Sequence, residues 1–371
     1  MHIGFLQTRF AATDIGGAEI HTENLARSLQ NRGHKVTIHT ARPPERRSGI
    51  DDLDVYEYKV PLHKNPVEEF SLAQHAWEDL TKCDVVTLTD DSAWRGVDFP
   101  VPTVMVFHFV WHGWIEKNRP LTSILTTKPQ AILYRWMEKK IVSKADRIVS
   151  ISPNMYKDIE RIEENEEKII SISNGVGINR FRPAKEKYDQ FTVHFQGRLI
   201  DLKNPDLLVE AANLSEKPWN LTIGGTGPLE DRLCDLIRTH ELEERVTLLG
   251  YLDENELVER YRRSHVYALP STYEGMPLAV LEAAASATPI IASPRAATDF
   301  VDDEIGWVVD PNPETLAKLL DRLYRSPEEV RHRGRNARER AEQYSWQEIS
   351  GQYEELYNEL LSDESKESKT S

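Results

Sequence analysis

Two glutamates in the second half of the chain have types and positions suited to binding hydroxyl groups. Glu274 falls in a loop after a predicted strand, and Glu282 falls in the second turn of the helix predicted over 278–286. They are therefore not a pair on one helix surface. Carboxylates accept hydrogen bonds from vicinal hydroxyls, so they predict a sugar at one and a ribose at the other. In the alternative, Glu274 only favours the helix dipole and Glu282 is an ordinary exposed residue.

The start of that helix has the features of an anion site. Gly275, Met276 and Pro277 lead into it, and proline suits the first turn of a helix. The N–H groups around Leu278 and Ala279 have no partner within the helix, so they present a positive dipole end to a phosphate.

Two cations, Arg198 and Lys203, follow the strand predicted over 191–197. Arginine engages oxygens in a bidentate manner and lysine adds a mobile point charge, so the pair predicts a diphosphate. The alternative is a solvated surface feature. Gly225 and Thr226 lie in another glycine-rich turn, which suits a base or ribose approaching the main chain.

The first half of the chain offers a glycine turn and a histidine. Gly16 and Gly17 stand just before a predicted helix, where a phosphate or sugar can approach the backbone closely, or where the chain simply turns. The turn does not match the dinucleotide motif, and no P-loop motif occurs in the chain. His108 ends an apolar strand, at the edge where ligands of α/β sheets bind, although such a histidine can also be a core residue.

Three further features each have two interpretations. Asp90 and Asp91 could bind a cation, but no third ligand stands near them, which favours loop solvation or helix capping. His112, with Trp111 and Trp114, could line an acceptor pocket or cap the sheet. The basic, aromatic-containing segment 116–147 could contact an anionic membrane surface peripherally, or it is a solvated helix face.

Composition excludes several classes of protein. The formal net charge of −15 disfavours nonspecific binding to nucleic acid. Cys83 and Cys234 are too few for a disulfide framework and lie in no zinc motif, so no metal is expected. The first residues lack a signal-peptide pattern and no apolar stretch is long enough to span a membrane, so a cytoplasmic location is expected.

Strand-like and helix-like segments alternate along the chain, which predicts parallel α/β units. The strands are expected at 2–7, 35–40, 84–89, 103–108, 146–151, 191–197, 219–224, 246–250, 265–269, 289–292 and 306–309. The helices are expected at 18–31, 69–81, 130–144, 153–161, 204–213, 228–240, 253–263 and 278–286, with helical pattern again from about 313 to 361.

Turn residues and a proline near 174–183 mark a domain boundary. The prediction is therefore two Rossmann-like, doubly wound domains, 1–183 and 184–344, and a polar, disordered tail at 362–371. Ligands of such sheets bind at the carboxyl ends of the strands, so the site is expected in a cleft between the domains.

The motifs taken together resemble glycosyltransferase family 4, the retaining, group 1 type enzymes with the GT-B fold. The resemblance covers nearly the whole chain. It rests on Gly16–Glu19, Ser152–Asn154, Asn174–Val176, Gly197–Leu199 with Lys203, Gly224–Pro228, Glu274 with Glu282, and Gly306–Pro311.

The resemblance implies transfer of a hexosyl group from a nucleotide diphosphate sugar, with retention of configuration and with no metal or cofactor. The donor is expected to be a UDP-sugar first and GDP-mannose second, and the acceptor a hydroxyl of a glycan, lipid-linked or small molecule. It also implies that the helix at about 345–361 packs back on the first, acceptor-side domain, while the second domain binds the donor.

The resemblance assigns roles to individual residues. The catalytic set is His108, beside the donor sugar, with Glu274, Arg198 and Lys203. The remaining donor-binding residues are Gly16, Gly17, Asn174, Gly225, Thr226, Gly275, Met276, Pro277, Leu278, Ala279 and Glu282, the last on the ribose.

The chain departs from the family pattern in two places. Thr87 and Thr89 stand where a histidine often occurs, and the loop 293–299 lacks the glycine common in relatives. Other functions on the same fold stay open, namely a nucleotide-sugar epimerase, a phosphorylase or a noncatalytic nucleotide-sugar-binding protein.

Overall fold

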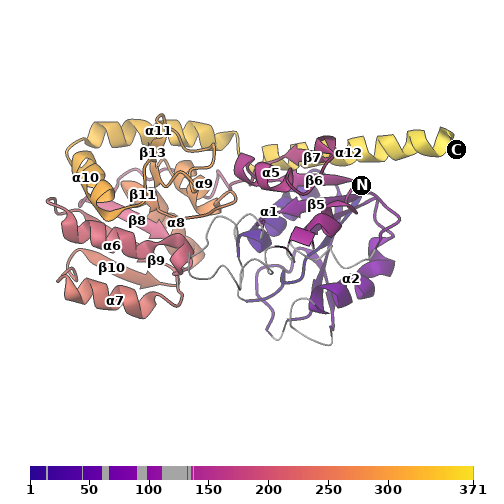
Figure 1. Cartoon of the computed structure of the whole chain (residues 1–371), viewed down its shortest axis with the longest axis horizontal. Coiled ribbons are helices and arrows are strands. Elements are labelled where there is room, and N and C mark those ends of the chain that lie inside the picture. Colours follow the sequence, from indigo (N-terminus) through magenta and orange to yellow (C-terminus); the bar gives the residue numbers. More distant parts are fainter. Residues whose placement is uncertain are drawn as a thin grey trace. The chain divides into compact units, whose positions relative to one another are not determined.

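The computed structural model describes residues 1–13, 16–43, 45–60, 67–89, 98–110, 132, 135, 136 and 138–370. These residues form two compact units, one made of Met1–Gly175 with Trp346–Ser371 and the other of Val176–Ser345. Each unit consists of a parallel sheet with flanking helices (Figure 1).

The boundary between the units comes earlier than residue 183, where the turn residues place it. The Val176 N–H donates to the Tyr344 carbonyl at 2.8 Å, and Val176 forms a bridge with Ser345. Phe181 is buried, and its carbonyl accepts a hydrogen bond from Arg338. The linker-like composition therefore belongs to a segment whose backbone is held by the second unit.

The sheet of the first unit has seven parallel strands in the order β3-β2-β1-β4-β5-β6-β7. The strands are β1 (His2–Leu6), β2 (Lys35–Ala41), β3 (Asp54–Tyr58), β4 (Val85–Thr89), β5 (Thr103–Phe107), β6 (Arg147–Ser150) and β7 (Ile169–Ser171). The two edge strands, β3 and β7, are not among the predicted strands. Both carry partly exposed side chains and are short, so the apolar pattern of a buried parallel strand is weak in them.

The helices of the first unit are α1 (Gly17–Asn31), α2 (Val67–Leu80), α5 (Pro153–Ile159), the 3₁₀ turn η3 (Glu166–Lys168) and α12 (Trp346–Thr370). Helix α12, at the C-terminal end of the chain, packs against α1. The Ser28 hydroxyl of α1 donates to the Trp346 carbonyl, and Arg32 forms an ion pair with Glu354. The predicted helix 130–144 lies partly outside the described residues; of its described residues, 132, 135, 136 and 138–142 are helical.

Helix α12 continues to Thr370, into the tail 362–371 for which disorder is predicted. Glutamate and lysine are frequent there, and both are good helix formers. A segment that is too polar to fold alone can therefore extend a helix already started by its packed first turns.

The sheet of the second unit has six parallel strands in the order β10-β9-β8-β11-β12-β13. The strands are β8 (Thr192–Gln196), β9 (Asn220–Gly224), β10 (Val246–Gly250), β11 (Val266–Leu269), β12 (Ile290–Ala292) and β13 (Gly306–Val308). All six coincide with predicted strands to within a residue or two. The fold class predicted from the alternating pattern is confirmed in both units.

The helices of the second unit are η4 (Asp201–Lys203), α6 (Pro205–Leu214), α7 (Glu230–Thr239), α8 (Glu254–Arg263), α9 (Leu278–Ala285), α10 (Pro313–Tyr324) and α11 (Pro327–Glu342). Helix α9 is almost entirely alanine, leucine and valine, and most of it is buried, with α11 packed against it. A helix that is apolar on nearly all sides needs such cover.

Candidate active site

Arg198 and Lys203 lie in the loop that follows β8, at the carboxyl edge of the second sheet. Arg198 is exposed. Lys203 ends the 3₁₀ turn η4, after which Asn204 takes a left-handed conformation (φ 48°) and Pro205 begins α6. The tight turn keeps both cations beside the strand end rather than along the helix that follows.

Lys203 is paired with Glu274, which comes from the loop after β11. The lysine Nζ lies 2.5 Å from the glutamate Oε1, and the side chains are 21% and 9% exposed. Two hydrogen bonds hold the loops together: the Thr272 backbone N–H donates to the Leu202 carbonyl (2.9 Å), and the Asn204 side-chain amide donates to the Pro270 carbonyl (3.0 Å). The predicted diphosphate cation and the predicted sugar-binding carboxylate therefore meet in one place.

The start of helix α9 lies directly after Glu274 in the chain. Pro277 is the N-cap residue, and the Val280 N–H donates back to its carbonyl at 3.1 Å. Leu278 and Ala279, both partly exposed, occupy the first turn, whose N–H groups find no acceptor within a helix. The positive end of α9 thus stands next to the Lys203–Glu274 pair.

Glu282 lies one turn further along α9, where its carboxyl group is poorly solvated. Burial raises its pKa to about 7, against the opposing effect of the Tyr261 hydroxyl and the Arg180 guanidinium. The Tyr261 hydroxyl is itself buried and makes no hydrogen bond of normal geometry among the described residues. Glu282 is therefore a mixture of protonated and ionised forms near neutral pH.

The glycine-rich turn after β9 has a structural reason for its glycines. Gly225 has φ 118°, and a Cβ there would collide with the Gly197 carbonyl oxygen. At Gly227 a Cβ would collide with the Leu199 carbonyl oxygen. The Leu199 N–H also donates to the Thr226 carbonyl. The turn packs tightly on the loop that carries Arg198, and this contact requires the glycines. The predicted contact of Gly225 and Thr226 with a base or ribose is not tested by this geometry.

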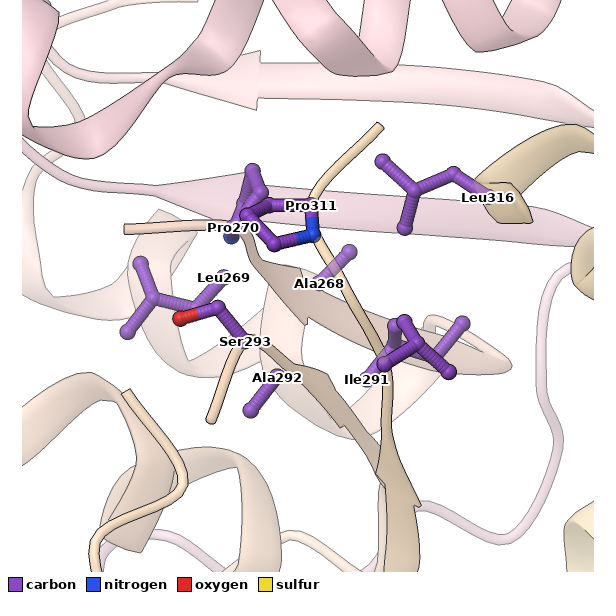
Figure 2. A pocket seen from close by; sticks show the side chains of 9 residues that line it. Ala268, Leu269, Pro270, Ile291, Ala292, Ser293, Pro311 and Leu316 are labelled. Atoms are coloured by element: carbon purple, nitrogen blue, oxygen red, sulfur yellow. The ribbon is translucent and has the colours of Figure 1, made fainter. Parts of the chain in front are cut away.

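A narrow hollow lies at the carboxyl ends of β11 and β12 (Figure 2). It is lined by Ala268, Leu269, Pro270, Ile291, Ala292, Ser293, Val309, Pro311 and Leu316. The hollow is too narrow to hold a water molecule, and its lining is nearly all apolar. It is a gap in packing rather than a ligand site.

His108 follows β5 at the carboxyl edge of the first sheet. Its Nε2 atom is buried and has no hydrogen-bond partner among the described residues. Its ring lies 4.7 Å, centroid to centroid, from the ring of His21 on α1. Burial, with a smaller effect of His21, holds the pKa of His108 well below its ordinary value. The ring is therefore neutral at pH 7 and leaves a polar atom available.

Asn174 is engaged by that same His21. Its Oδ1 lies 2.8 Å from Nδ1 of His21, and the asparagine side chain is only 3% exposed. The next residue, Gly175, packs against the Trp346 ring, where a Cβ would be 2.6 Å away. The Asn174 side chain thus ties the end of the first unit to α1. Its predicted contact with the donor is not tested by this geometry.

Gly16 and Gly17 stand at the start of α1, after the loop that follows β1. The Gly16 N–H donates to the Glu19 carboxylate at 2.8 Å, and Gly17 is exposed. A carboxylate of the chain itself therefore occupies one position at this helix end, while the exposed Gly17 leaves the backbone open to approach.

Two family models match adjoining parts of the chain. Residues 15–180 match the model described as Glycosyltransferase Family 4, and residues 178–340 match the one described as Glycosyl transferases group 1. D-inositol 3-phosphate glycosyltransferase of Kineococcus radiotolerans is 30% identical and aligns over 95% of this chain and 93% of its own. The chain belongs to the group 1 glycosyltransferases.

Other glycosyltransferases show the same likeness at lower identity. MMP α-(1→4)-mannosyltransferase of Mycolicibacterium hassiacum is 25% identical over 97% of this chain and 98% of its own. Among solved structures, sucrose-phosphate synthase from Thermosynechococcus elongatus superposes with a TM-score of 0.83 at 23% identity, covering 98% of this chain and 99% of that one. Anabaena HepE in complex with UDP and glucose gives 0.76 at 16%, covering 96% and 99%. The predicted GT-B fold is confirmed.

The two departures of this glycosyltransferase from its family pattern have structural explanations. Thr87 and Thr89 are buried; the Thr87 hydroxyl pairs with that of Tyr357 on α12, and Thr89 donates to the Leu6 carbonyl. In the loop after β12, Thr298 has φ 50°, a conformation that is uncommon for a β-branched residue. The loop adopts there a turn that glycine would make without strain.

Sequence reasoning did not find Thr298, His21 or Tyr261. The Thr298 hydroxyl donates to the Ala297 carbonyl at 2.7 Å and lies 3.5 Å from the Met276 sulfur, so it packs beside the turn between Glu274 and α9. The absence of glycine from its loop was the available signal. His21 and Tyr261 lie on helix faces that look like ordinary core, and only packing brings them to His108 and Glu282.

Some predictions fall outside the part of the chain that the structure describes. Asp90, Asp91, Trp111, His112 and Trp114 are among them, as is all of 116–131. Within the described residues, no group of three or more histidine, cysteine, aspartate or glutamate side chains could hold a metal ion. No helix of the described part has both the length and the apolar character needed to cross a membrane.

Proposed function

We propose that this glycosyltransferase moves a hexosyl group from a nucleotide diphosphate sugar to an acceptor hydroxyl, with retention of configuration. The observation that carries the proposal is the Lys203–Glu274 pair beside the first turn of α9, with Arg198 exposed on the same edge. One place then offers cations for a diphosphate and a carboxylate for sugar hydroxyls.

The diphosphate is bound by Arg198, Lys203 and the N–H groups around Leu278 and Ala279. As the bond from the sugar to the diphosphate breaks, negative charge grows on the leaving oxygen, and these groups stabilise it without a metal ion. Lys203 can serve both partners, because its ammonium group has three N–H donors and only one is directed at Glu274.

Retention follows from the leaving group acting as the base. The bond between the anomeric carbon and the phosphate oxygen breaks, and the acceptor oxygen bonds to that carbon on the same face. The acceptor proton passes to the departing phosphate oxygen. Glu274 forms an ion pair with Lys203, so it binds the sugar hydroxyls rather than attacking the anomeric carbon. Neutral His108 accepts a hydrogen bond from a sugar hydroxyl at its Nε2 atom.

A UDP-sugar is the first donor to test, since the structural neighbour HepE was solved with UDP and with UDP-glucose. GDP-mannose is the second, in view of the mannosyltransferase among the relatives. Glu282 receives the ribose hydroxyls of either nucleotide and does so best when ionised.

The donor is tested by thermal unfolding with UDP, GDP, ADP, TDP and their sugar conjugates. A ligand that binds only the folded protein raises its stability, by about 2.7 kcal/mol at a hundredfold excess over Kd. We expect the unfolding temperature to rise with one nucleotide only, and this rise to be lost in Arg198→Ala. The control variant Arg238→Ala should keep it, because the Arg238 guanidinium is 72% exposed and pairs with Asp235 on α7. No shift with any nucleotide would contradict the proposal.

The reaction class needs a second measurement. With the donor known, proton NMR of the product assigns its anomeric configuration, and assays with and without a chelator test the metal-free mechanism. Donor binding without turnover in any acceptor mixture would favour a noncatalytic nucleotide-sugar-binding protein. Cleavage that depends on phosphate would identify a phosphorylase. Conversion of the donor in the absence of an acceptor would identify an epimerase.

A peripheral membrane contact through 116–147 is a separate proposal. In the described part of this segment, Ile132 and Trp136 are 70% and 55% exposed at helical spacing. Against it, Lys139 pairs with Glu164, and the acidic stretch around Glu160–Glu167 lowers the attraction to anionic lipid. Flotation with anionic vesicles tests this proposal. The proposal is supported if Trp136→Ala abolishes vesicle binding and Trp77→Ala, at an exposed tryptophan on α2, does not.

A further inference from the structure

A second histidine, His21, is buried beside His108 in the first unit. The His21 side chain is 0% exposed, and its ring centroid lies 4.7 Å from that of His108, with an angle of 70° between the two ring planes. The Trp346 ring is another neighbour of His21, at 5.4 Å and 74°. His21 lies on α1, His108 follows β5, and Trp346 begins α12. Three segments that are distant in the sequence therefore meet at one imidazole ring.

Both ring nitrogens of His21 have hydrogen-bond partners. The Nδ1 atom lies 2.8 Å from Oδ1 of Asn174, and since an amide oxygen can only accept, Nδ1 carries the proton. The Nε2 atom is then an acceptor. The Tyr353 hydroxyl on α12 lies 3.4 Å from it and donates. Asn174 and Tyr353 thus fix both the tautomer and the plane of the His21 ring.

The His21 ring and its tyrosine partner are uncharged at neutral pH. Burial lowers the pKa of His21 to about 4, against the opposing effect of the Asn174 side chain. Burial also raises the pKa of the Tyr353 hydroxyl well above its ordinary value, so the hydroxyl keeps its proton and stays a donor. At pH 7, His21 is therefore a neutral ring with both nitrogens engaged.

The His108 ring depends on its surroundings for its orientation. Its Nε2 atom is buried and has no hydrogen-bond partner among the described residues. The χ2 torsion of a histidine has a broad energy profile, so packing decides where the ring nitrogens point. Because the His21 ring is held at two atoms and lies against the His108 ring, it limits how far the His108 ring can turn.

We infer that His21 is a positioning residue for His108. Asn174 and Tyr353 hold the His21 ring in the orientation that this role needs, and His108 then presents Nε2 to the donor sugar in a fixed direction. Displacement of a reacting group by about 1 Å can cost on the order of a hundredfold in rate. Helix α12 thus contributes to catalysis through Tyr353 without contacting the substrate. The catalytic role rests on the proposed function, whereas the anchoring of the two rings does not.

The anchoring is tested by NMR on the full chain, isotope-labelled at the histidine ring nitrogens, and this measurement needs no turnover. Spectra of His21→Gln and His108→Ala assign the two rings. We expect a proton on Nδ1 of His21 and a hydrogen-bonded lone pair on its Nε2. In Tyr353→Phe the signals of His108 should shift or broaden, because His21 has lost one of its two anchors. A proton on Nε2 of His21, or unchanged His108 signals in Tyr353→Phe, would overturn the inference.

The catalytic role is tested by a double-mutant cycle in turnover. Tyr353→Phe removes one hydroxyl and keeps the ring, so we expect kcat to fall by about tenfold with the KM for the donor nearly unchanged. His21→Gln removes the ring, and kcat should fall by about a hundredfold. In a His108→Ala background neither substitution should lower the residual kcat further, because both act through His108. Losses that multiply in that background would contradict the positioning role.

Tyr357→Phe is the matched control. Tyr357 is buried one turn further along α12, and its hydroxyl lies 2.8 Å from that of Thr87 rather than against His21. The control variant also loses one buried hydrogen bond, so its stability should fall about as far as that of Tyr353→Phe. We expect kcat and the His108 signals to stay as in wild type. A fall in kcat as large as that of Tyr353→Phe would overturn the inference, because general packing of α12 would then explain both.

Failure of the proposed function would give a different result. If no nucleotide stabilises the protein and no donor is turned over, while the NMR signals of His108 still respond to Tyr353→Phe, the proposed function is rejected and the positioning of His108 by His21 is supported. If the donor is turned over and Tyr353→Phe has the kcat of the wild type, the positioning role is rejected and the proposed function stands.

Discussion

Glu282 makes stability and donor binding depend on pH in opposite directions. Its pKa is raised by burial from 4.5 to about 7. Between these values the folded protein holds a proton that the unfolded chain has lost, so stability falls as pH rises. Since a tenfold change in proton affinity is about 1.4 kcal/mol, the loss is on the order of 3 kcal/mol by pH 8.

The substitution Glu282→Gln removes the titrating group and keeps its shape. We expect the variant to match the wild type in free energy of unfolding below pH 4.5, where both the folded and the unfolded wild type carry the proton. At pH 8 the variant is more stable by about 3 kcal/mol, because it keeps no buried charge. Donor affinity falls in the variant, and in the wild type it rises through pH 7 as the carboxylate forms.

The assay is urea unfolding at a series of pH values, with nucleotide titrations at the same values. Glu244→Gln, at an exposed position on the second unit, is the matched control for the loss of a carboxylate. A stability difference between Glu282→Gln and wild type that stays constant from about pH 4 to about pH 8 would refute the reasoning. It would mean that the carboxyl group is better solvated than its position on α9 indicates.

Three substitutions test the backbone of the two units by urea unfolding. Gly225→Ala should cost about 3 kcal/mol or more, because a Cβ would collide with the Gly197 carbonyl and φ is positive. Gly197→Ala, whose Cβ would make only ordinary contacts, the nearest at 3.5 Å from the Phe195 ring, should cost less than about 1 kcal/mol. Thr298→Asn should stabilise by roughly 0.5–1 kcal/mol, because asparagine tolerates the left-handed conformation at φ 50°. Gly175→Ala should destabilise by roughly 1–3 kcal/mol by displacing the Trp346 ring.

Controls and contrary results are specific to each. A small cost for Gly225→Ala would mean that the turn relaxes away from the Arg198 loop. Thr298→Val keeps the branched side chain and loses the hydroxyl, so it should be less stable than wild type; a Thr298→Asn variant no more stable than wild type would contradict the strain argument. If Trp346→Leu does not reduce the cost of Gly175→Ala, the ring is not the obstacle.

The strands and helices could be predicted almost to the residue, because buried parallel strands are short apolar runs between amphipathic helices. The exceptions are informative. The edge strands β3 and β7 lack that run, and the linker-like segment 176–183 packs on the second unit because Arg338 and Tyr344, distant in sequence, bind its backbone. Composition cannot show partners that come from elsewhere in the chain.

The candidate site was predictable where a local motif creates it. The site is built from short-range features: cations that follow a strand, and a glutamate, a glycine and a proline that precede a helix. Their order along the chain specifies the family. The sequence also shows the glycines of the 224–227 turn, but it does not show why glycine is needed there. Only the structure shows that Gly225 and Gly227 make room for the Gly197–Leu199 backbone.

By itself, then, the sequence determined the fold class, the positions of the elements and the identity of the candidate donor-side residues, since these depend on periodicity and on neighbours in the chain. Tertiary structure alone decided that Lys203 meets Glu274 and that Glu282 is buried enough to titrate near pH 7. Pairing and desolvation are properties of residues brought together by the sheet, and no local pattern encodes them.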